Sequence, residues 1–334
     1  MTILEYKDID RSKWAEFVET HPNGNVFQTP EMYDVYACTD HTQPLVVAVS
    51  EENEIVGLLL AQILTNGNAL TSWLTARSII IGGPLIKDDD SQILELLLLE
   101  YKKRLPKKVI YSEIRPIYDI ENISVQLGQK HWLRKGHYNL VLSLDKTEDE
   151  LFTQMHKERR RNVNQAVKAG LEFRELTVIE DIHHVVALIE KTYRRKHVPI
   201  GYLNMFDEVY KYMSEYACFF GTYTLDGKMI AGEVRLCYGN LVYAWFAGSD
   251  EEYFKLRPND FTMWNVIKWA HDKGYKWFDF GGGGEPGKPY GVRDYKLKYG
   301  CEMFDYGRFV YTHRSLMYGV AAKAYAIYHK IKGK

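Results

Sequence analysis

The sequence predicts an α/β protein in which one unit, a mixed and mostly antiparallel sheet flanked by helices, occurs twice. The chain has 334 residues, which is enough for about two domains. Its hydrophobic share of 46%, charged share of 26% and aromatic share of 14% are those of a folded protein and exclude a disordered chain. The order helix–helix–strand–strand–strand–helix–strand recurs after roughly 170 residues, which favours a duplicated unit.

The first copy opens with two short helices and continues with a strand meander. Its predicted elements are helices over residues 14–20 and 30–36, strands over 45–50, 55–64 and 69–74, a helix over 91–105 and a strand over 109–114. Asn, Asp, Glu and Gly separate the strands, as in consecutive hairpins. Leu94, Leu97 and Leu98 share one face of the longest helix, so we expect that face to be buried.

The second copy repeats this order after a basic lead-in segment. Its predicted elements are helices over residues 182–194 and 204–216, strands over 217–224, 228–238 and 241–247, a helix over 259–273 and a strand over 276–280. Gly57 follows Ile-Val where Gly232 follows Ile-Ala, so the copies share local detail. In the lead-in segment, Thr147 and Glu150 form a capping box and Gly170 a stop, which predicts one helix of about 20 residues.

These elements give an N-terminal domain over residues 1–143, a C-terminal domain over 144–310 and a C-terminal helix over 311–334. In the last of these, apolar residues such as Leu316 and Val320 alternate with basic ones. We expect this helix either to pack on the protein or to touch the inner face of the membrane.

Charge and cysteine usage exclude several classes of protein. The net charge of −1 gives no overall attraction to DNA or to a membrane. The four cysteines lack metal-ligand spacing, so we expect no metal and no tightly bound cofactor. They are typical of reduced thiols, and the N-terminus lacks a signal-peptide core, which together predict a cytoplasmic protein.

Three strings in the second half carry a resemblance to a known family. They are HKERRRN at 156–162 with KAG at 168–170, FDFGG at 278–282 and YGVRDYKLKYG at 290–300. With the duplicated meander, they resemble the FemABX peptidyltransferases of peptidoglycan bridge formation, and more specifically the FemAB-like proteins of the GNAT acetyltransferase type.

This resemblance implies a tandem GNAT-like fold and an N-acyltransferase. The donor would be an acyl-CoA or an aminoacyl-tRNA, and the acceptor an amine on a peptide or a lipid-linked saccharide of the cell envelope. Residues 253–260 replace the usual acetyl-CoA loop, which leaves both donors open. The reaction would take place in the cytoplasm, at the inner membrane face.

Three residues are candidates for catalysis, where the strands over 229–236, 241–247 and 277–280 are expected to separate. Asp279 either orients an amine or acts as a base, or it accepts hydrogen bonds from the glycine loop that follows. Glu233 matches the general-base carboxylate that the GNAT resemblance implies, or it pairs with Arg235. Arg293 suits a phosphate or carboxylate of the acceptor.

Further residues are candidates for donor or acceptor binding. Gly281 and Gly282 either cradle a phosphate or belong to a plain flexible loop. Residues 291–299 are predicted to be extended, so Tyr290 and Lys296 belong either to a cationic binding row or to a guarded edge strand.

Two more groups of cations complete the set. Lys255, Arg257 and Asn259 precede the predicted helix over 259–273, where Asn259 or Asp260 is a suitable N-cap. They hold a pyrophosphate or tRNA phosphate, or they simply cap the helix. On the lead-in helix, Arg160 and Arg161 either contact a polyanion or form a solvated face.

The sequence thus supports two hypotheses of different kinds. The first is an acyltransferase acting on an amine of a polysaccharide or peptidoglycan precursor. The second is a non-catalytic binding module that holds a lipid-linked saccharide or an RNA in the same region.

Overall fold

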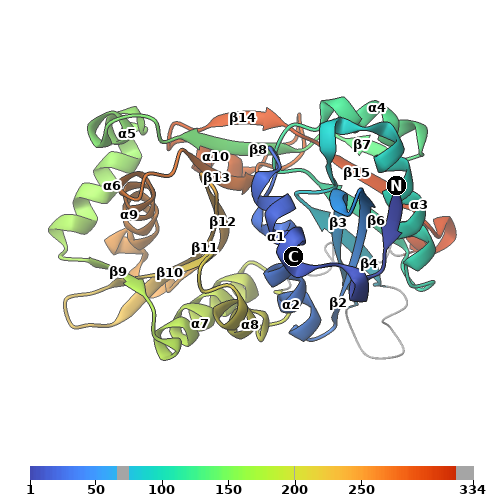
Figure 1. Ribbon diagram of the computed structural model, residues 1–334. Coiled ribbons are helices and arrows are strands. Elements are labelled where there is room, and N and C mark those ends of the chain that lie inside the picture. The colour runs from blue at the N-terminus through green and yellow to red at the C-terminus, as the bar shows by residue number, and fades with distance from the viewer. Residues whose placement is uncertain (66–74, 199, 321–334) are drawn as a thin grey trace. The chain divides into compact units, whose positions relative to one another are not determined.

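The computed structural model describes residues 1–65, 75–198 and 200–320 and divides the chain into two compact units (Figure 1). Unit 1 consists of Met1–Gly136 and Tyr306–Lys334, and unit 2 of His137–Asp305. The expected boundaries at 143 and 310 differ from these. Residues 138–143 are a strand of the second sheet, and residues 308–312 return to the first. Of the expected C-terminal helix, residues 315–320 are helical and 321–334 lie outside the described residues.

Unit 1 is built on one sheet with the strand order β1-β2-β3-β4-β6-β15-β7, and β5 pairs with β3. Among the described residues, β4 and β6 pair parallel and the other neighbouring strands of this sheet pair antiparallel. The expected strand over 69–74 lies outside the described residues. The main elements are β1 (Thr2–Leu4), α1 (Arg11–Thr20), α2 (Pro30–Cys38), β2 (Thr42–Glu51), β3 (Glu54–Leu64), β4 (Arg77–Ile81), β5 (Leu85–Ile86), α3 (Ser91–Arg104), β6 (Tyr111–Arg115), α4 (Glu121–Gln129), β7 (Leu133–Lys135) and β15 (Arg308–Thr312).

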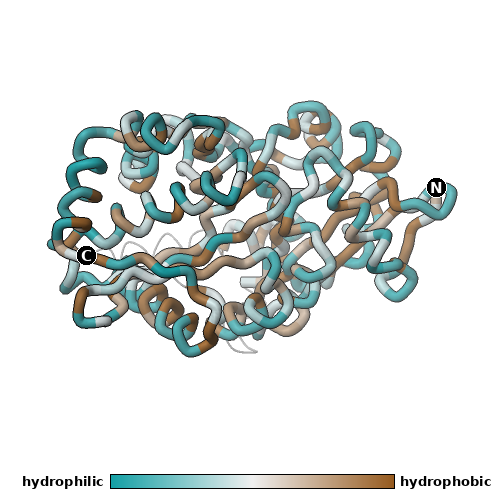
Figure 2. Tube along the Cα trace, turned by 60° about the vertical axis from the view of Figure 1, so that its left-hand side comes forward, coloured by the Kyte–Doolittle hydropathy of each residue, from teal (hydrophilic) through white to brown (hydrophobic). Residues whose placement is uncertain are grey.

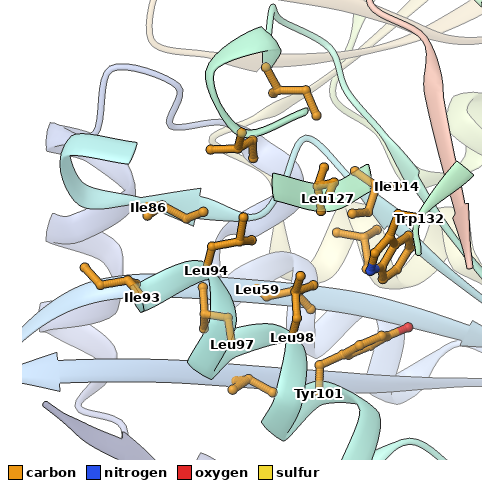
Figure 3. Close-up of a cluster of buried hydrophobic side chains, with 14 of the residues drawn as sticks. Leu59, Ile86, Ile93, Leu94, Leu97, Leu98, Tyr101, Ile114, Leu127 and Trp132 are labelled. Atoms are coloured by element: carbon orange, nitrogen blue, oxygen red, sulfur yellow. The ribbon is translucent and has the colours of Figure 1, made fainter. Parts of the chain in front are cut away.

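Helix α3 supplies much of the core of unit 1. Leu94, Leu97 and Leu98 are buried, which confirms the predicted face, and they lie beside Leu59 of β3 (Figure 3). Asp90 caps the helix with its side chain, which fixes where the apolar face begins.

Unit 2 is built on a second sheet with the strand order β14-β8-β13-β12-β11-β10-β9. Among its described residues, β12 and β13 pair parallel and the other neighbouring strands pair antiparallel. The main elements are β8 (Tyr138–Ser143), α5 (Glu148–Gln154), α6 (Lys157–Lys168), β9 (Glu172–Leu176), α7 (Ile179–Arg195), α8 (Met205–Tyr212), β10 (Ala217–Tyr223), β11 (Met229–Tyr238), β12 (Leu241–Ser249), η5 (Glu251–Leu256), α9 (Pro258–Asp272), β13 (Trp277–Gly282), α10 (Gly291–Leu297) and β14 (Glu302–Asp305).

Helices α7 and α9 both pack on the strands β10 to β12. Helix α7 is amphipathic, with Ile182, Val185 and Ile189 buried, whereas most residues of α9 are buried. Figure 2 shows hydrophobic and hydrophilic residues alternating along the trace of the chain. The contact of α7 with β12 is close, because a Cβ on Gly248 would lie 2.3 Å from the backbone nitrogen of Ile189. Glycine is therefore required there for the helix to reach the sheet.

The lead-in segment forms two helices where the sequence predicted one. The capping box of Thr147 and Glu150 is confirmed at the start of α5. The chain becomes extended at Met155, and the ring of His156 accepts a hydrogen bond from the backbone of Glu158 to start α6. A second N-cap inside the segment thus ends the first helix.

Residues 291–297 form helix α10, so the predicted extended segment is wrong. The backbone N–H groups of Arg293 and Asp294 both donate to the carbonyl of Tyr290. The hydroxyls of Tyr295 and Tyr299 lie 2.8 Å apart, at the spacing of one helical turn. As a result Arg293 and Lys296 are three residues apart on a helix rather than on opposite faces of a strand.

The two sheets confirm the predicted duplication, with one change in connectivity. In each, four strands that pair antiparallel are followed by a parallel strand, β6 or β13, and then by two more strands. Next to β6 stands β15 from the end of the chain, whereas next to β13 stands β8, which follows unit 1 in the sequence. No described helix is both long and apolar enough to cross a bilayer.

Candidate functional site

The sheet of unit 2 opens at the place that the sequence predicted. Strand β12 pairs with β13 only from Leu241 and Trp277 to Tyr243 and Asp279, although β12 continues to Ser249. On its other side, the register of β12 with β11 shifts by one residue at Trp245, which is a β-bulge. Bulges re-aim side chains and are frequent next to active sites, which makes the residues at this separation the candidates for a site.

Asp279 lies at the last paired position and is completely buried. Its Oδ1 accepts a hydrogen bond of 2.6 Å from the backbone nitrogen of Gly281, and its Oδ2 one of 3.3 Å from the amide of Asn139. Burial raises the pKa of Asp279 to about 6, against the opposing effect of these two donors and of Lys296. These contacts are those of the structural alternative, in which the carboxylate holds the glycine loop.

Lys296 on α10 is only partly buried, and its ammonium donates a 2.8 Å hydrogen bond to the carbonyl of Gly282. Burial lowers the pKa of Lys296 to about 8, with a further contribution from Arg235, whereas Asp279 acts in the opposite direction. The sequence assigned Lys296 to binding. In the structure it acts electrostatically on Asp279, and the residue is partly exposed.

Glu233 is buried in β11 and forms an ion pair with Arg235, as the structural alternative predicted. Burial raises the pKa of Glu233, and Arg235 opposes that effect. The guanidinium of Arg235 also lies over the ring of Phe278, 5.5 Å from its centroid. The pair is closed off from solvent, so Glu233 does not face a ligand in this structure.

Arg293 holds the glycine loop together. Its guanidinium donates to the carbonyls of Gly283, Glu285 and Lys288 at 3.3, 3.3 and 2.6 Å. Tyr290, just before α10, is exposed. Arg293 therefore fixes the loop that supplies Gly281 N–H to Asp279 and the Gly282 carbonyl to Lys296.

The residues ahead of α9 are exposed and take a different arrangement from the predicted one. Arg257, in the left-handed region with φ of 63°, is the N-cap residue, and Pro258 begins the helix. Asn259 lies within the first turn, so its predicted capping role is wrong. The carbonyl of Lys255 accepts a 2.9 Å hydrogen bond from the side chain of Gln165 on α6.

Arg160 and Arg161 lie on α6, in a shallow groove of about 620 Å³. Arg161 is exposed, and the buried Nε of Arg160 has no hydrogen-bond partner. This groove is lined by residues of α5 and α6, and Asp279 and Lys296 are not among them.

Sequence reasoning missed a buried network around Asp260. The Asp260 carboxylate accepts hydrogen bonds from Arg159 at 2.5 Å, Asn162 at 2.6 Å and Tyr299 at 2.8 Å. The network ties α6 and α10 to α9, and so it positions the helix that carries Lys296. Its only local signal was an aspartate that also suits an N-cap, because the partners come from distant segments.

The second missed residue is Asn139 of β8, for which no local pattern exists. Its contact with Asp279 depends on the pairing of β8 with β13, and these two strands are separated by more than half of the sequence of unit 2. Elsewhere in the described residues, no group of three or more His, Cys, Asp or Glu side chains is placed to hold a metal ion.

Comparison with known protein families gives a match to part of the chain. The family model described as an acetyltransferase (GNAT) domain matches residues 153–297, which include α6 to α10. No curated protein sequence matches the chain.

Several solved structures share the fold over nearly the whole chain. FemX superimposes with a TM-score of 0.74 at 16% identity, over 96% of this chain and 99% of its own. The C-terminal domain of a putative lysylphosphatidylglycerol synthetase from Agrobacterium fabrum gives 0.60 at 11%, over 95% and 96%. A tandem GNAT protein from the clavulanic acid biosynthesis pathway gives 0.55 at 11%, over 90% and 94%.

Identities this low show a common fold. The family model adds a match of residues 153–297 to a GNAT acetyltransferase domain. The whole chain shares its fold with FemX and with a tandem GNAT protein.

Proposed function

We propose that unit 2 transfers an acyl or aminoacyl group from an acyl-CoA or an aminoacyl-tRNA to an amine of a cell-envelope precursor. The observation that carries this proposal is Lys296, a partly buried amine with a pKa of about 8 that interacts electrostatically with the buried carboxylate of Asp279. The resemblance to FemABX enzymes supports an envelope acceptor. One structural neighbour, named for lysylphosphatidylglycerol, supports an aminoacyl group as the cargo.

The proposed reaction is a direct displacement at the acyl carbon. The acceptor nitrogen forms a bond to this carbon, and the bond from the carbon to the carrier sulfur or oxygen breaks. The proton lost by the nitrogen ends on the carrier thiol or hydroxyl. The electron pair held on the carbonyl oxygen between these two steps is the charge that the protein must stabilise.

Lys296 in its ammonium form provides that stabilisation. The carboxylate of Asp279 favours the charged form of this amine, and the carbonyl of Gly282 orients it. Asp279 is buried and does not contact the substrate in this proposal. It acts through Lys296 and is therefore a positioning residue. Both groups are in the required state at a pH above about 6, where Asp279 is ionised, and below about 8, where Lys296 keeps its proton.

Replacing Lys296 by Met tests the proposal, because Met keeps much of the side-chain volume and removes the charge. We expect kcat to fall by about 10²–10³-fold, the effect of removing one oxyanion donor. The wild type should show a kcat/KM that rises through pH 6 and falls above pH 8. The assay follows labelled transfer from acetyl-CoA and, separately, from mixed aminoacyl-tRNA to a lysine-containing stem peptide, an amino sugar and phosphatidylethanolamine vesicles.

Lys268→Met is the matched control, since Lys268 is an ion-paired lysine on the surface of α9. It should keep the wild-type rate. If Lys296→Met folds, as judged by circular dichroism and thermal unfolding, and turns over like the control, the proposed site is wrong.

A further inference from the structure

Two cysteines of unit 2 lie next to each other. The Sγ atoms of Cys218 and Cys237 are 3.6 Å apart, and neither residue is in a disulfide. They come from β10 and β11, which lie side by side in the second sheet (Figure 1). Because the two residues are 19 positions apart in the sequence, it is the fold, and no local motif, that brings the two sulfur atoms together.

The strand register accounts for this approach. Cys218 stands opposite Arg235, and Cys237 follows Arg235 by two residues, on the same face of the sheet. The two cysteines are therefore diagonal neighbours across one antiparallel pair of strands. The backbone N–H of Cys237 donates to the carbonyl of Tyr216 at 2.6 Å, so the strands are already paired at this point. The two thiols can thus react with each other without a change of fold.

The pair lies where the core of unit 2 meets the solvent. Cys237 is buried in a hydrophobic cluster that also contains residues of β10, β13 and α9. Cys218 packs against this cluster and stays partly exposed. A small molecule from the solvent therefore reaches the sulfur of Cys218 before that of Cys237.

The hydrogen bond between the two thiols makes the pair easier to ionise once. As the donor, Cys218 lowers the pKa of Cys237 against the effect of burial, and Tyr275 and Arg235 act in the same direction as Cys218. The same contact and burial raise the pKa of Cys218, and Glu175 of β9 also raises it. After the first proton is lost, the remaining one lies in the hydrogen bond between the sulfur atoms, so it can pass from Cys218 to Cys237.

We propose that Cys218 and Cys237 form a site of reversible oxidation, at which a hydroperoxide converts the two thiols into a disulfide between β10 and β11. The distance between the sulfur atoms then shrinks from 3.6 Å to about 2.0 Å. Diagonal residues on paired strands are usually farther apart than the residues of an unstrained disulfide, so this bond is easily reduced again. The inference goes beyond acyl transfer and does not depend on it.

The oxidation takes place in two steps. The thiolate sulfur of Cys218 attacks one oxygen of the hydroperoxide and the O–O bond breaks. The other oxygen leaves with a proton, as water or an alcohol, and Cys218 becomes a sulfenic acid. The sulfur of Cys237 then attacks that of Cys218, the S–O bond breaks, and the hydroxyl leaves as water with the proton of Cys237. The two thiols are oxidised by two electrons in total, and the hydroperoxide is reduced by two.

The second cysteine also protects the first from irreversible damage. A sulfenic acid that meets more peroxide becomes a sulfinic acid, which dithiothreitol does not reduce. With its sulfur 3.6 Å away, Cys237 competes directly with this second oxidation of Cys218. The product therefore depends on whether Cys237 is present.

Mass spectrometry of the full chain after treatment with hydrogen peroxide tests the inference. Remaining thiols are blocked with N-ethylmaleimide, the monomer is isolated on a non-reducing gel, and it is digested without reductant. We expect a peptide pair joined through Cys218 and Cys237, with a mass two hydrogen atoms below the sum of the two thiol peptides. Dithiothreitol should restore both thiols.

Two variants sharpen the test, and circular dichroism checks that each is folded. In Cys237→Ala we expect Cys218 to become a sulfinic acid that dithiothreitol does not reverse. Cys38→Ala is the matched control, because Cys38 is exposed and belongs to unit 1. It should form the joined peptide pair at the wild-type yield.

Two results would overturn the inference, and the first needs no variant. One is the absence of the joined peptide pair at a peroxide concentration that oxidises the exposed Cys38 of the wild type. The other is an equal yield of sulfinic acid at Cys218 in the wild type and in Cys237→Ala, since Cys237 would then not react with the sulfenic acid. Both readouts are independent of turnover, so neither result bears on the proposed function.

Discussion

The two units place a carboxylate at the same point of the same framework and surround it differently. In unit 1 the parallel pairing of β4 with β6 starts at Tyr111, and Glu113 follows two residues later. In unit 2 the pairing of β12 with β13 starts at Trp277, and Asp279 follows two residues later. A valine of the next strand stands opposite each carboxylate, Val310 in unit 1 and Val141 in unit 2.

The partners of the two carboxylates account for their different behaviour. Glu113 binds Arg115 at 2.7 Å and Arg308 at 3.0 Å. Burial opposes its ionisation, yet the two arginines outweigh that effect and lower the pKa of Glu113. In unit 2 the residue equivalent to Arg308 is Asn139, a neutral amide. The position of Arg115 is taken by Gly281, so Asp279 lacks both guanidinium partners, and burial raises its pKa instead.

The strand pairing around the two carboxylates also differs between the units. In unit 1 the pairing of β4 with β6 continues past the carboxylate to Ile81 and Arg115, so that sheet stays closed. In unit 2 it ends at the carboxylate. The comparison teaches that the duplicated framework was kept while the opening and the titratable group belong to the second unit alone.

The largest expected effect concerns the buried pair on β11. Aligned through Gly57 and Gly232, Glu233 and Arg235 replace two buried leucines of unit 1, Leu58 and Leu60. Arg235→Leu should destabilise the protein by about 3–5 kcal/mol, because it leaves the Glu233 carboxylate buried and alone.

The double variant Glu233→Leu/Arg235→Leu installs the pattern of unit 1. Urea unfolding should place its stability near that of the wild type, since well-packed apolar residues often replace a buried ion pair without loss. A double variant as unstable as the single one would mean that the two units are not interchangeable at this site.

A smaller effect, with the opposite sign, is expected at Asp279. Its pKa is raised from 3.8 to about 6, so the folded state favours the protonated form. The resulting stabilisation is present below pH 3.8 and is lost as the pH rises through 6. Asp279→Asn should therefore make the protein more stable above pH 6, by at most about 3 kcal/mol at 1.4 kcal/mol per pKa unit. Thermal unfolding at pH 4 and pH 7.5 checks this, and a variant less stable than wild type at pH 7.5 would contradict it.

The smallest effect is expected at Glu113, where the sign reverses. Its pKa is lowered, so its stabilisation is present above its ordinary pKa and is lost as the pH falls through the lower, folded-state value. Glu113→Gln should cost about 1 kcal/mol at pH 7.5. The cost should shrink in acid and leave turnover unchanged. Equal and parallel pH dependence in Glu113→Gln and Asp279→Asn would remove the contrast between the units.

The sequence was sufficient for the elements and their order, because hairpin turns and helical spacing are local signals. The meander of β10 to β12, helix α3 with its leucine face and the capping box of Thr147 all follow from neighbouring residues. Helix α10 was missed because seven residues are too few to establish a period, and the alternation of charges in them fits a strand equally well.

The sequence predicted where the candidate site lies but not what each of its residues does. Asp279 was singled out, yet the partners that determine its behaviour, Asn139 and Lys296, reach it through strand pairing and through α10. Such contacts join segments that are far apart in the chain, and no spacing in the sequence reports them. For the same reason Arg235 could be named as a partner of Glu233, since those two residues are neighbours on one strand.

The return of the chain at β15 makes unit 2 an insertion within unit 1. Strand β15 pairs with β7, the last strand before the insertion, and the backbone N–H of His137 donates to the side chain of Asp305 at the insertion's two ends. During synthesis the whole of unit 2 is therefore made while the first sheet still lacks β15. Removing unit 1 would also remove the pairing of β7 with β15, which holds the two ends of unit 2 next to each other. This gives a reason to retain a unit whose sheet stays closed.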